Sequence, residues 1–174
     1  MSLPARSAFV VFVALTVSGC ADSPRRTDKI VGPPSLDVSA SRTLLQCPTS
    51  QSASAVGLLG PLGGVVSLGG HSVVVPFGAV SLPTLITLRA PASSYVEVDV
   101  TANDLLSFLF RRPVSITIDY SRCLAEATAG APLAVWHIDP QTKALLEPMG
   151  GVDDPVRRRI TFQTGHLSGY AIAQ

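Results

Sequence analysis

The 174 residues include 13 Lys and Arg against 12 Asp and Glu, so the formal net charge is +1. A nearly neutral chain without a basic stripe argues against nucleic-acid binding. The length is sufficient for one domain with a hydrophobic core. The 14 Gly and 14 Pro are interpreted as turn residues between short elements rather than as a sign of disorder.

An uncharged apolar run, residues 7–17, follows a short positive start at Arg6. The run is shorter than the roughly 20 residues that cross a bilayer, and it fits the roughly 7–15 residues of a secretory signal. The next residues, "VSGC" (Val17–Cys20), resemble the lipobox of bacterial lipoproteins. This resemblance implies a signal peptide over residues 1–19 and a mature chain anchored by acyl groups such as palmitate on Cys20. The alternative is an ordinary signal peptide followed by an incidental cysteine.

The residues after Cys20 indicate the location and the tether. In enterobacterial lipoproteins an Asp at the next position favours the inner membrane, so Ala21 favours the outer membrane, on its periplasmic or surface face. Residues 20–42 are polar and contain three prolines, too little apolar surface to fold. We therefore expect a lipid-anchored flexible tether over residues 20–42 and a folded domain over residues 43–174, in the cell envelope.

Within the expected domain, apolar and polar residues alternate with a period of two, which indicates half-buried strands. The pattern, with Gly and Pro turn signals between the segments, predicts an all-β antiparallel sandwich of about nine short strands. At most one short helix is expected, within residues 121–130. The predicted strands cover residues 65–68, 71–76, 84–90, 95–101, 113–120, 132–139, 143–149, 159–164 and 169–173.

Two cysteines remain after Cys20, namely Cys47 and Cys123. An even number of cysteines in an exported chain predicts a disulfide, and two cysteines allow only one pairing. Closing so long a loop contributes about 4 kcal/mol in the chain-entropy description. Two buried free thiols are the alternative.

Three segments carry a family resemblance. Gly63–Leu88 contains two glycines, two strands and the turn "VPFGAV" (Val75–Val80). Phe110–Cys123 reads "FRRPVSITIDYSRC", and the chain closes with "TGHLSGYAIA". In this order and spacing they resemble the β-sandwich domain shared by zonula occludens proteins, netrin receptors and ankyrins (a ZU-five-like domain), over about residues 60–174. The resemblance implies a scaffold module that docks other proteins and carries no cofactor. The domains that usually accompany it are absent, so no particular partner is implied.

The turn "VPFGAV" also has a physical explanation that is independent of any family. Pro76 fixes its own φ and ends a strand, and Gly78 can take the positive φ of a tight turn. Ala79 is small enough to lie beneath the turn. We therefore expect this segment to form a corner of the sandwich without a catalytic role.

The closing segment contains the tripeptide His166-Leu167-Ser168. In some members of the family, and in related cleavage sites of nucleoporins and adhesion receptors, such a tripeptide cuts its own backbone. The resemblance implies Ser168 as nucleophile, His166 as base, and an N-to-O acyl shift at the Leu167–Ser168 bond. Other members have the tripeptide without cleavage, and Leu167 stands where the family usually has Phe. We expect a structural role for these residues, with self-cleavage as the alternative.

Other chemistry has little support in the sequence. His71, His137 and His166 are the only histidines, no two have the spacing of metal ligands, and no HExxH, CxxC or GxSxG motif is present. We therefore expect no enzyme activity, no cofactor and no metal. Trp136 and His137 are expected on opposite faces of one strand, with Trp136 in the core. If Trp136 instead lay on a binding face, it would favour a carbohydrate-binding sandwich.

The sequence thus predicts a cell-envelope lipoprotein that presents a non-enzymatic β-sandwich for binding or scaffolding. Its expected partners are the membrane, through the lipid anchor, and an envelope or extracellular protein that the sequence does not identify.

Overall fold

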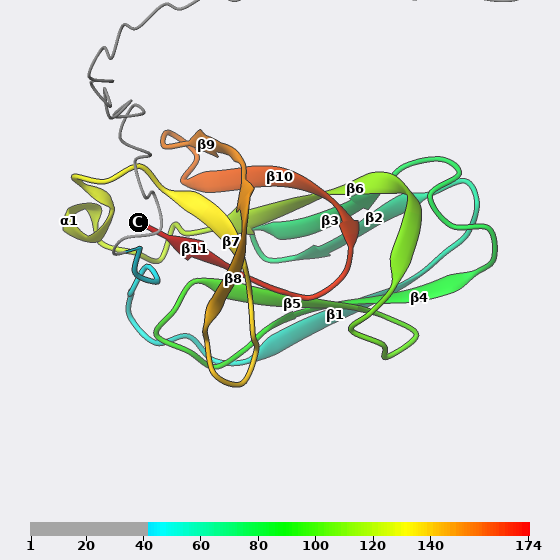
Figure 1. Ribbon diagram of the computed structural model, residues 1–174, viewed down its shortest axis with the longest axis horizontal. Coiled ribbons are helices and arrows are strands. Elements are labelled where there is room, and N and C mark those ends of the chain that lie inside the picture. Colours follow the sequence, from blue (N-terminus) through cyan, green and yellow to red (C-terminus); the bar gives the residue numbers. More distant parts are fainter. Residues whose placement is uncertain (1–41) are drawn as a thin grey trace, which may run out of the picture. The chain divides into compact units, whose positions relative to one another are not determined.

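Two antiparallel β-sheets make up the part of the chain that the computed structural model describes, residues 42–174 (Figure 1). The six-stranded sheet contains, in spatial order, β1 (Ala53–Leu59), β4 (Thr84–Ala90), β5 (Glu97–Ala102), β11 (Gly169–Ala173), β7 (Ala134–Ile138) and β8 (Leu145–Gly150). The five-stranded sheet contains β2 (Gly64–Leu68), β3 (His71–Val75), β6 (Leu109–Asp119), β10 (Arg159–His166) and β9 (Val152–Asp154). One helix lies in this range, the single turn α1 (Ala125–Thr128), and no helix there is long and apolar enough to cross a membrane. The predicted all-β, sandwich-like fold is confirmed.

The alternating pattern of the strands places one face of each sheet in a shared core. In β6, Val114, Ile116 and Ile118 are fully buried, whereas the residues between them are only partly buried. Tyr170 and Ile172 of β11 are buried in the same core. Burying a side chain of this size contributes about 1.5–3 kcal/mol, so the alternation determines which face of each strand turns inward.

The structure contains two strands that the sequence pattern did not predict, β1 and the short β9. In β1 the larger residues Val56 and Leu58 face solvent, while Ala55 and Gly57 face inward, so the apolar pattern does not mark the buried face. A Cβ on Gly57 would lie only 2.7 Å from Cγ2 of Val66 on β2. The two sheets therefore meet closely at this edge, and small inward residues permit that contact.

The segment "VPFGAV" forms the predicted corner after β3. Gly78 has a φ of 75°, a value that favours glycine, and Ala79 is buried beneath the turn. The Gly78 N–H donates a hydrogen bond to the carbonyl oxygen of Pro61 at 2.8 Å. This bond joins the β3–β4 loop to the β1–β2 turn at one end of the sandwich.

A disulfide joins Cys47, before β1, to Cys123, after β6, across 76 positions of sequence. This is the pairing predicted from the sequence. The neighbouring Arg122 donates guanidinium hydrogen bonds to the carbonyl oxygens of Pro48 and of Tyr95, the latter at 2.5 Å. The disulfide and Arg122 together fix the segment that leads into β1.

The first described residues are also attached to the last strand. Thr43 and Gln174 exchange two backbone hydrogen bonds of 3.0 and 2.9 Å, and the Leu45 N–H donates to the Ile172 carbonyl at 2.8 Å. These bonds attach the first described residues to β11, and the domain boundary at residue 43 stays a prediction. The predicted signal peptide, the lipidation of Cys20 and nearly all of the predicted tether lie outside the described residues.

Candidate functional site

The tripeptide His166-Leu167-Ser168 lies where the chain passes from one sheet to the other. His166 ends β10 in the five-stranded sheet, and Gly169 begins β11 in the six-stranded sheet. Leu167 is buried in the core, and its N–H donates to the Phe108 carbonyl at 3.1 Å. The Ser168 carbonyl accepts a hydrogen bond of 3.0 Å from the N–H of Val100. The tripeptide therefore forms the crossover between the two sheets.

Tyr170 fixes the conformation of this crossover. Its hydroxyl donates to the His166 carbonyl at 2.6 Å, and the Thr164 hydroxyl donates to the same carbonyl at 2.9 Å. A tyrosine that bonds back to the backbone a few residues upstream stabilises corners in immunoglobulin-type sandwiches. Burial raises the pKa of Tyr170 to about 12, so the hydroxyl keeps its proton and remains a donor at neutral pH.

The geometry required for self-cleavage is not seen at the crossover. A base must reach the hydroxyl that it activates, at about 2.6–3.2 Å. Among the hydrogen bonds of residues 42–174, none joins the His166 ring to the Ser168 hydroxyl; the His166 Nδ1 instead lies 3.4 Å from the Thr164 hydroxyl. Cleavage after Leu167 stays a prediction, and the intact mass of the purified protein tests it.

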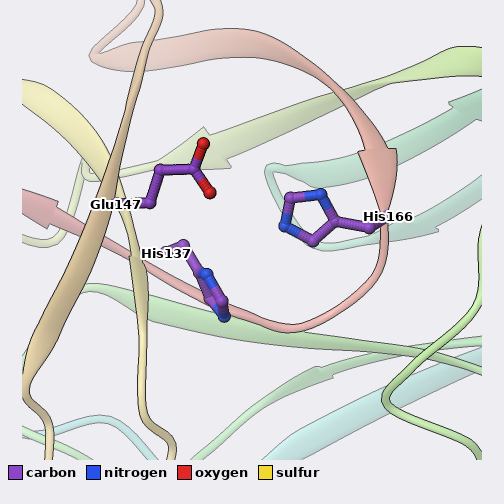
Figure 2. Close-up of side chains that lie close together, drawn as sticks. All are labelled: His137, Glu147 and His166. Carbon is purple, nitrogen blue, oxygen red and sulfur yellow. The ribbon is translucent and has the colours of Figure 1, made fainter.

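The crossover brings His166 beside two residues that the sequence does not connect with it. His137 lies on β7, on the same face as the buried Tyr170 with which it pairs across the strands. Glu147 lies opposite His137 on β8. The two imidazole rings are 5.4 Å apart, centroid to centroid, in an edge-to-face arrangement. One possible ligand atom from each of the three side chains lies within 4.8 Å of the others (Figure 2).

The hairpin that carries His137 and Glu147 is itself well fixed. At its turn, the Asp139 carboxylate accepts hydrogen bonds of 2.8 Å from the N–H groups of Gln141 and Thr142. Lys143, in the left-handed region at φ 62°, extends its ammonium group to 2.6 Å from the buried carboxylate of Glu97. This ion pair fastens the turn to β5 and thereby limits how far β8 can move.

The electrostatic environment favours an uncharged His137. Burial lowers the pKa of the His137 imidazole, the nearby His166 lowers it further, and Glu147 acts in the opposite direction. A neutral imidazole has a free lone pair that can accept a proton or bind a metal ion. His137 and His166 are partly buried, whereas Glu147 is exposed.

An apolar hollow of about 510 Å³ opens beside the two histidines. Most of its wall comes from the β5–β6 loop and from the crossover, and both histidines line it. Its lining residues are Leu106, Ser107, Phe108, Leu109, His137, His166, Leu167 and Ser168.

Two of the three histidines lie side by side, although their spacing in the sequence is not that of metal ligands. The expected absence of a metal, which was based on that spacing, stays a prediction. His137 and His166 meet because β7 and β10, which belong to different sheets, approach at the crossover. Only the third histidine, His71, lies elsewhere, where its Nδ1 accepts the Asp119 N–H at 3.1 Å. No feature of the sequence marks Glu147 as a site residue; its proximity to His137 follows only from the cross-strand pairing of β7 and β8.

Trp136 was the basis of the carbohydrate-binding alternative. It pairs with Ala171 on β11, while His137 pairs with Tyr170, so Trp136 and His137 lie on opposite faces as predicted. Trp136 is only partly buried and lies on the face opposite to the core residue Tyr170, so the expectation that it belongs to the core is wrong. Its Nε1 is buried without a hydrogen-bond partner among the described residues. A sugar stacks on an open aromatic face, and the structure adds no observation that favours this alternative.

Comparison with known proteins leaves the family open. A scan against protein-family models matches none of them, and a search of the curated proteins finds no match. The resemblance to the domain of zonula occludens proteins, netrin receptors and ankyrins therefore stays an expectation from the sequence.

Proposed function

We propose that this protein is a lipid-tethered, non-enzymatic binding module of the bacterial cell envelope. The lipobox-like "VSGC" and the polar residues up to 42 support the tether. The disulfide between Cys47 and Cys123 supports an oxidising compartment, in which such bonds form and persist. The partner is a protein of the envelope, bound by one end of the sandwich.

The observation that carries the proposal is an apolar tip at that end. Leu62 in the β1–β2 turn is 84% exposed, and Phe77 in the β3–β4 loop is 65% exposed. The hydrogen bond between Gly78 and Pro61 places the two loops side by side. Exposed large side chains on two adjoining, well-fixed loops are typical of binding sites carried by a rigid scaffold.

Charge and position indicate the kind of partner. The exposed Arg111 and Arg112 lie near the start of β6 beside this tip, with Nε of Arg112 3.7 Å from the position of a Cβ on Gly78. The tip lies at the end of β1 and β4 that is remote from the C-terminus, beside which the first described residues lie (Figure 1). The partner therefore needs an apolar pocket with an acidic rim, and aromatic and Arg side chains are common anchors in such contacts.

Site-specific photocrosslinking in intact cells tests this proposal. A photoreactive phenylalanine at position 77 is expected to capture one discrete envelope protein, and Arg112→Glu is expected to lower the yield by reversing the charge. The control position is Val156, which is 91% exposed in the turn between β9 and β10. The same products from both positions, capture of lipid alone, or a yield unaffected by Arg112→Glu would contradict the proposal.

The anchor requires a separate test. Replacing Cys20 with Ser removes the residue that the lipobox resemblance would lipidate. The unmodified protein is expected in the membrane fraction and the variant in the soluble fraction, because acyl chains bind a bilayer by burying their methylene groups. Retention of the variant in the membrane fraction would refute lipidation at Cys20.

A further inference from the structure

His137, Glu147 and His166 come from three strands: β7 and β8 belong to the six-stranded sheet, and β10 belongs to the five-stranded sheet. We propose that these three side chains bind a divalent transition-metal ion, Zn²⁺ above all, and that the ion fastens the β7–β8 hairpin to the end of β10. The inference is independent of the apolar tip and of its protein partner.

The donor set is appropriate for zinc. Two imidazoles and one carboxylate occur together at zinc sites that keep a fourth position open. Imidazole also binds copper, nickel and iron, whereas magnesium and calcium prefer oxygen ligands alone. The chemistry of the three side chains therefore favours zinc over the hard cations.

The three candidate ligand atoms need to move only slightly closer together to bind one zinc ion. Zinc lies about 2.0–2.2 Å from nitrogen and oxygen ligands, so ligand atoms at the corners of a tetrahedron are roughly 3.4 Å apart. The three ligand atoms lie within 4.8 Å of one another, and Figure 2 shows the Glu147 carboxylate and the His166 ring directed toward each other. Glu147 is exposed and its carboxylate has no hydrogen-bond partner among the described residues, so rotation of the side chain can close the gap.

Irregular strand pairing occurs at both histidines. The β7–β8 register shifts between His137 and Ile138, where Leu146 is the additional residue on β8. The β10–β6 register shifts between Thr164 and His166. A β-bulge redirects side chains and is frequent beside functional sites, although it weakens the ladder. Two separate register shifts therefore direct side chains into the same small volume.

The neighbours of His166 favour binding through its Nε2. The Thr164 hydroxyl lies 3.4 Å from Nδ1 and can accept its proton, which leaves Nε2 free. Histidines that bind metals usually hold their other ring nitrogen in this way. Tyr170 and Thr164 both bond to the His166 carbonyl and so restrict the backbone from which the ring projects.

The hollow provides space for a fourth ligand. His137 and His166 both line it, and the rest of its wall is mostly apolar. Since three protein ligands leave one tetrahedral position unfilled, a water molecule in the hollow is expected to complete the coordination.

Calorimetry on the full chain tests the site. The protein is purified in detergent without a polyhistidine tag, stripped with a chelator and titrated with Zn²⁺. We expect one Zn²⁺ per chain. His137→Ala and His166→Ala are each expected to weaken binding by more than about 100-fold, since losing an outer-shell partner alone costs about 10–100-fold.

Matched variants make the test specific. Glu147→Gln removes a charge from an exposed position and so is expected to fold, but it should weaken Zn²⁺ binding. His71→Gln and Glu126→Gln, a histidine and an exposed acid outside the cluster, should leave the affinity unchanged. In addition, Co²⁺ should give the intense visible bands of a four-coordinate ion in the unmodified protein. Absence of Zn²⁺ binding, or the same affinity in the His137, Glu147 and His166 variants as in the unmodified protein, would overturn the proposal.

Discussion

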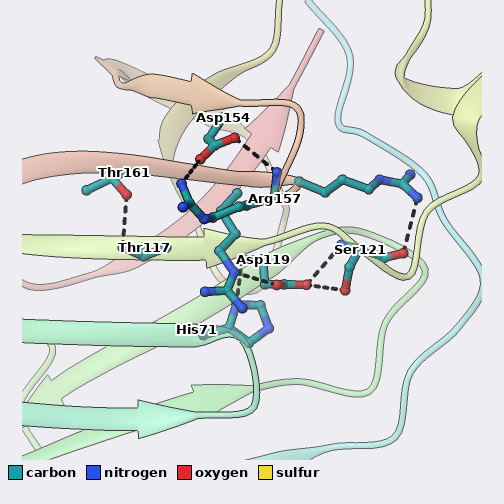
Figure 3. Close-up of polar contacts among 9 residues, drawn as sticks. His71, Thr117, Asp119, Ser121, Asp154, Arg157 and Thr161 are labelled. Atoms are coloured by element: carbon teal, nitrogen blue, oxygen red, sulfur yellow. Dashed lines mark hydrogen bonds and ion pairs between the residues drawn. The ribbon is translucent and has the colours of Figure 1, made fainter.

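Two polar clusters of the sandwich each contain histidine, yet they differ in how fully their hydrogen bonds are satisfied. In the first, the His71 Nδ1 accepts the Asp119 N–H. The Asp119 carboxylate in turn accepts hydrogen bonds from the Ser121 N–H at 2.9 Å, from the Ser121 hydroxyl at 2.5 Å and from the Arg159 guanidinium at 3.0 Å (Figure 3). We call these four residues the His71 cluster. Its polar groups stabilise one another within the protein.

The second cluster, His137, Glu147 and His166, is different. Its only side-chain hydrogen bond within residues 42–174 is the long contact between Thr164 and the His166 Nδ1. Imidazole and carboxylate groups placed together without protein partners retain the capacity to bind a ligand from outside. The comparison indicates that the His71 cluster stabilises the fold, whereas the second cluster is available for a metal ion.

The largest difference between the two regions is expected when the disulfide is removed, which should lower stability without changing Zn²⁺ affinity. Cys123 lies two residues after Ser121 of the His71 cluster, and losing a native disulfide from a small secreted domain costs about 2–5 kcal/mol. The double variant Cys47→Ser/Cys123→Ser should therefore lose about that much stability in urea unfolding. Its Zn²⁺ affinity under native conditions should be unchanged. A loss of both properties together would mean that the two regions are not separable.

The next effect is expected at Asp119. Hydrogen bonds to a charged group contribute about 1.5–3 kcal/mol, so Asp119→Ala should lower the free energy of unfolding by about 2–3 kcal/mol. Burial alone would raise the pKa of this carboxyl, but the hydrogen bonds from Ser121 and Arg159 lower it overall, which indicates a stabilised charge. Glu126→Ala, at an exposed position outside this network, is the control and should cost less than about 0.5 kcal/mol. Equal losses in the two variants would show that the Asp119 network contributes little.

A smaller effect is expected from the pH dependence of His71. Burial lowers its pKa below the ordinary 6.5, with Arg122 and Arg159 acting in the same direction and Asp119 in the opposite one. Below pH 6.5 the unfolded chain binds a proton that the folded chain does not, so stability falls with decreasing pH until the folded pKa is reached.

The slope due to one such group is at most about 1.4 kcal/mol per pH unit. Urea unfolding between pH 7 and pH 5 should show it in the unmodified protein, and His71→Gln should flatten it. His137 titrates in both proteins, so the difference between the two curves reports on His71 alone. Identical slopes would contradict this role of His71.

The smallest effect is expected at Glu147 in the absence of metal. Its carboxylate is exposed and has no hydrogen-bond partner among residues 42–174, so Glu147→Gln should change the unfolding free energy by less than about 0.5 kcal/mol. The matched measurement is thermal unfolding with Zn²⁺, which should raise the Tm of the unmodified protein more than that of the variant. A large loss of stability without metal would assign Glu147 a structural role like that of Asp119.

The strands of this fold were largely predictable, because a period of two has a direct physical cause. Val114, Ile116 and Ile118 face the core, and their sequence pattern shows it. β1 was not predicted because Ala55 and Gly57 face inward, where they are partly buried, while the larger Val56 and Leu58 are exposed, at the edge where the sheets meet. The alternation of apolar and polar residues along one strand does not predict small inward residues of this kind, because they are required by packing between the two sheets.

The metal-binding cluster was not predictable from the spacing of histidines. His137 and His166 become neighbours only through the crossover between sheets, and Glu147 joins them only through cross-strand pairing and a register shift. The closing tripeptide did draw attention to His166, although on the basis of self-cleavage, for which the structure provides no hydrogen bond. The burial of Tyr170 and Leu167 explains instead why that segment suits the end of the fold.

X-ray absorption at the zinc edge, on the full chain loaded with one equivalent of Zn²⁺, tests most directly that the second cluster is a ligand site. The account predicts four nitrogen and oxygen ligands at about 2.0–2.2 Å, with the outer-shell scattering of two imidazole rings that is lost in the double variant His137→Ala/His166→Ala. Sulfur ligands at about 2.3 Å, or a coordination shell that is unchanged in the double variant, would contradict it.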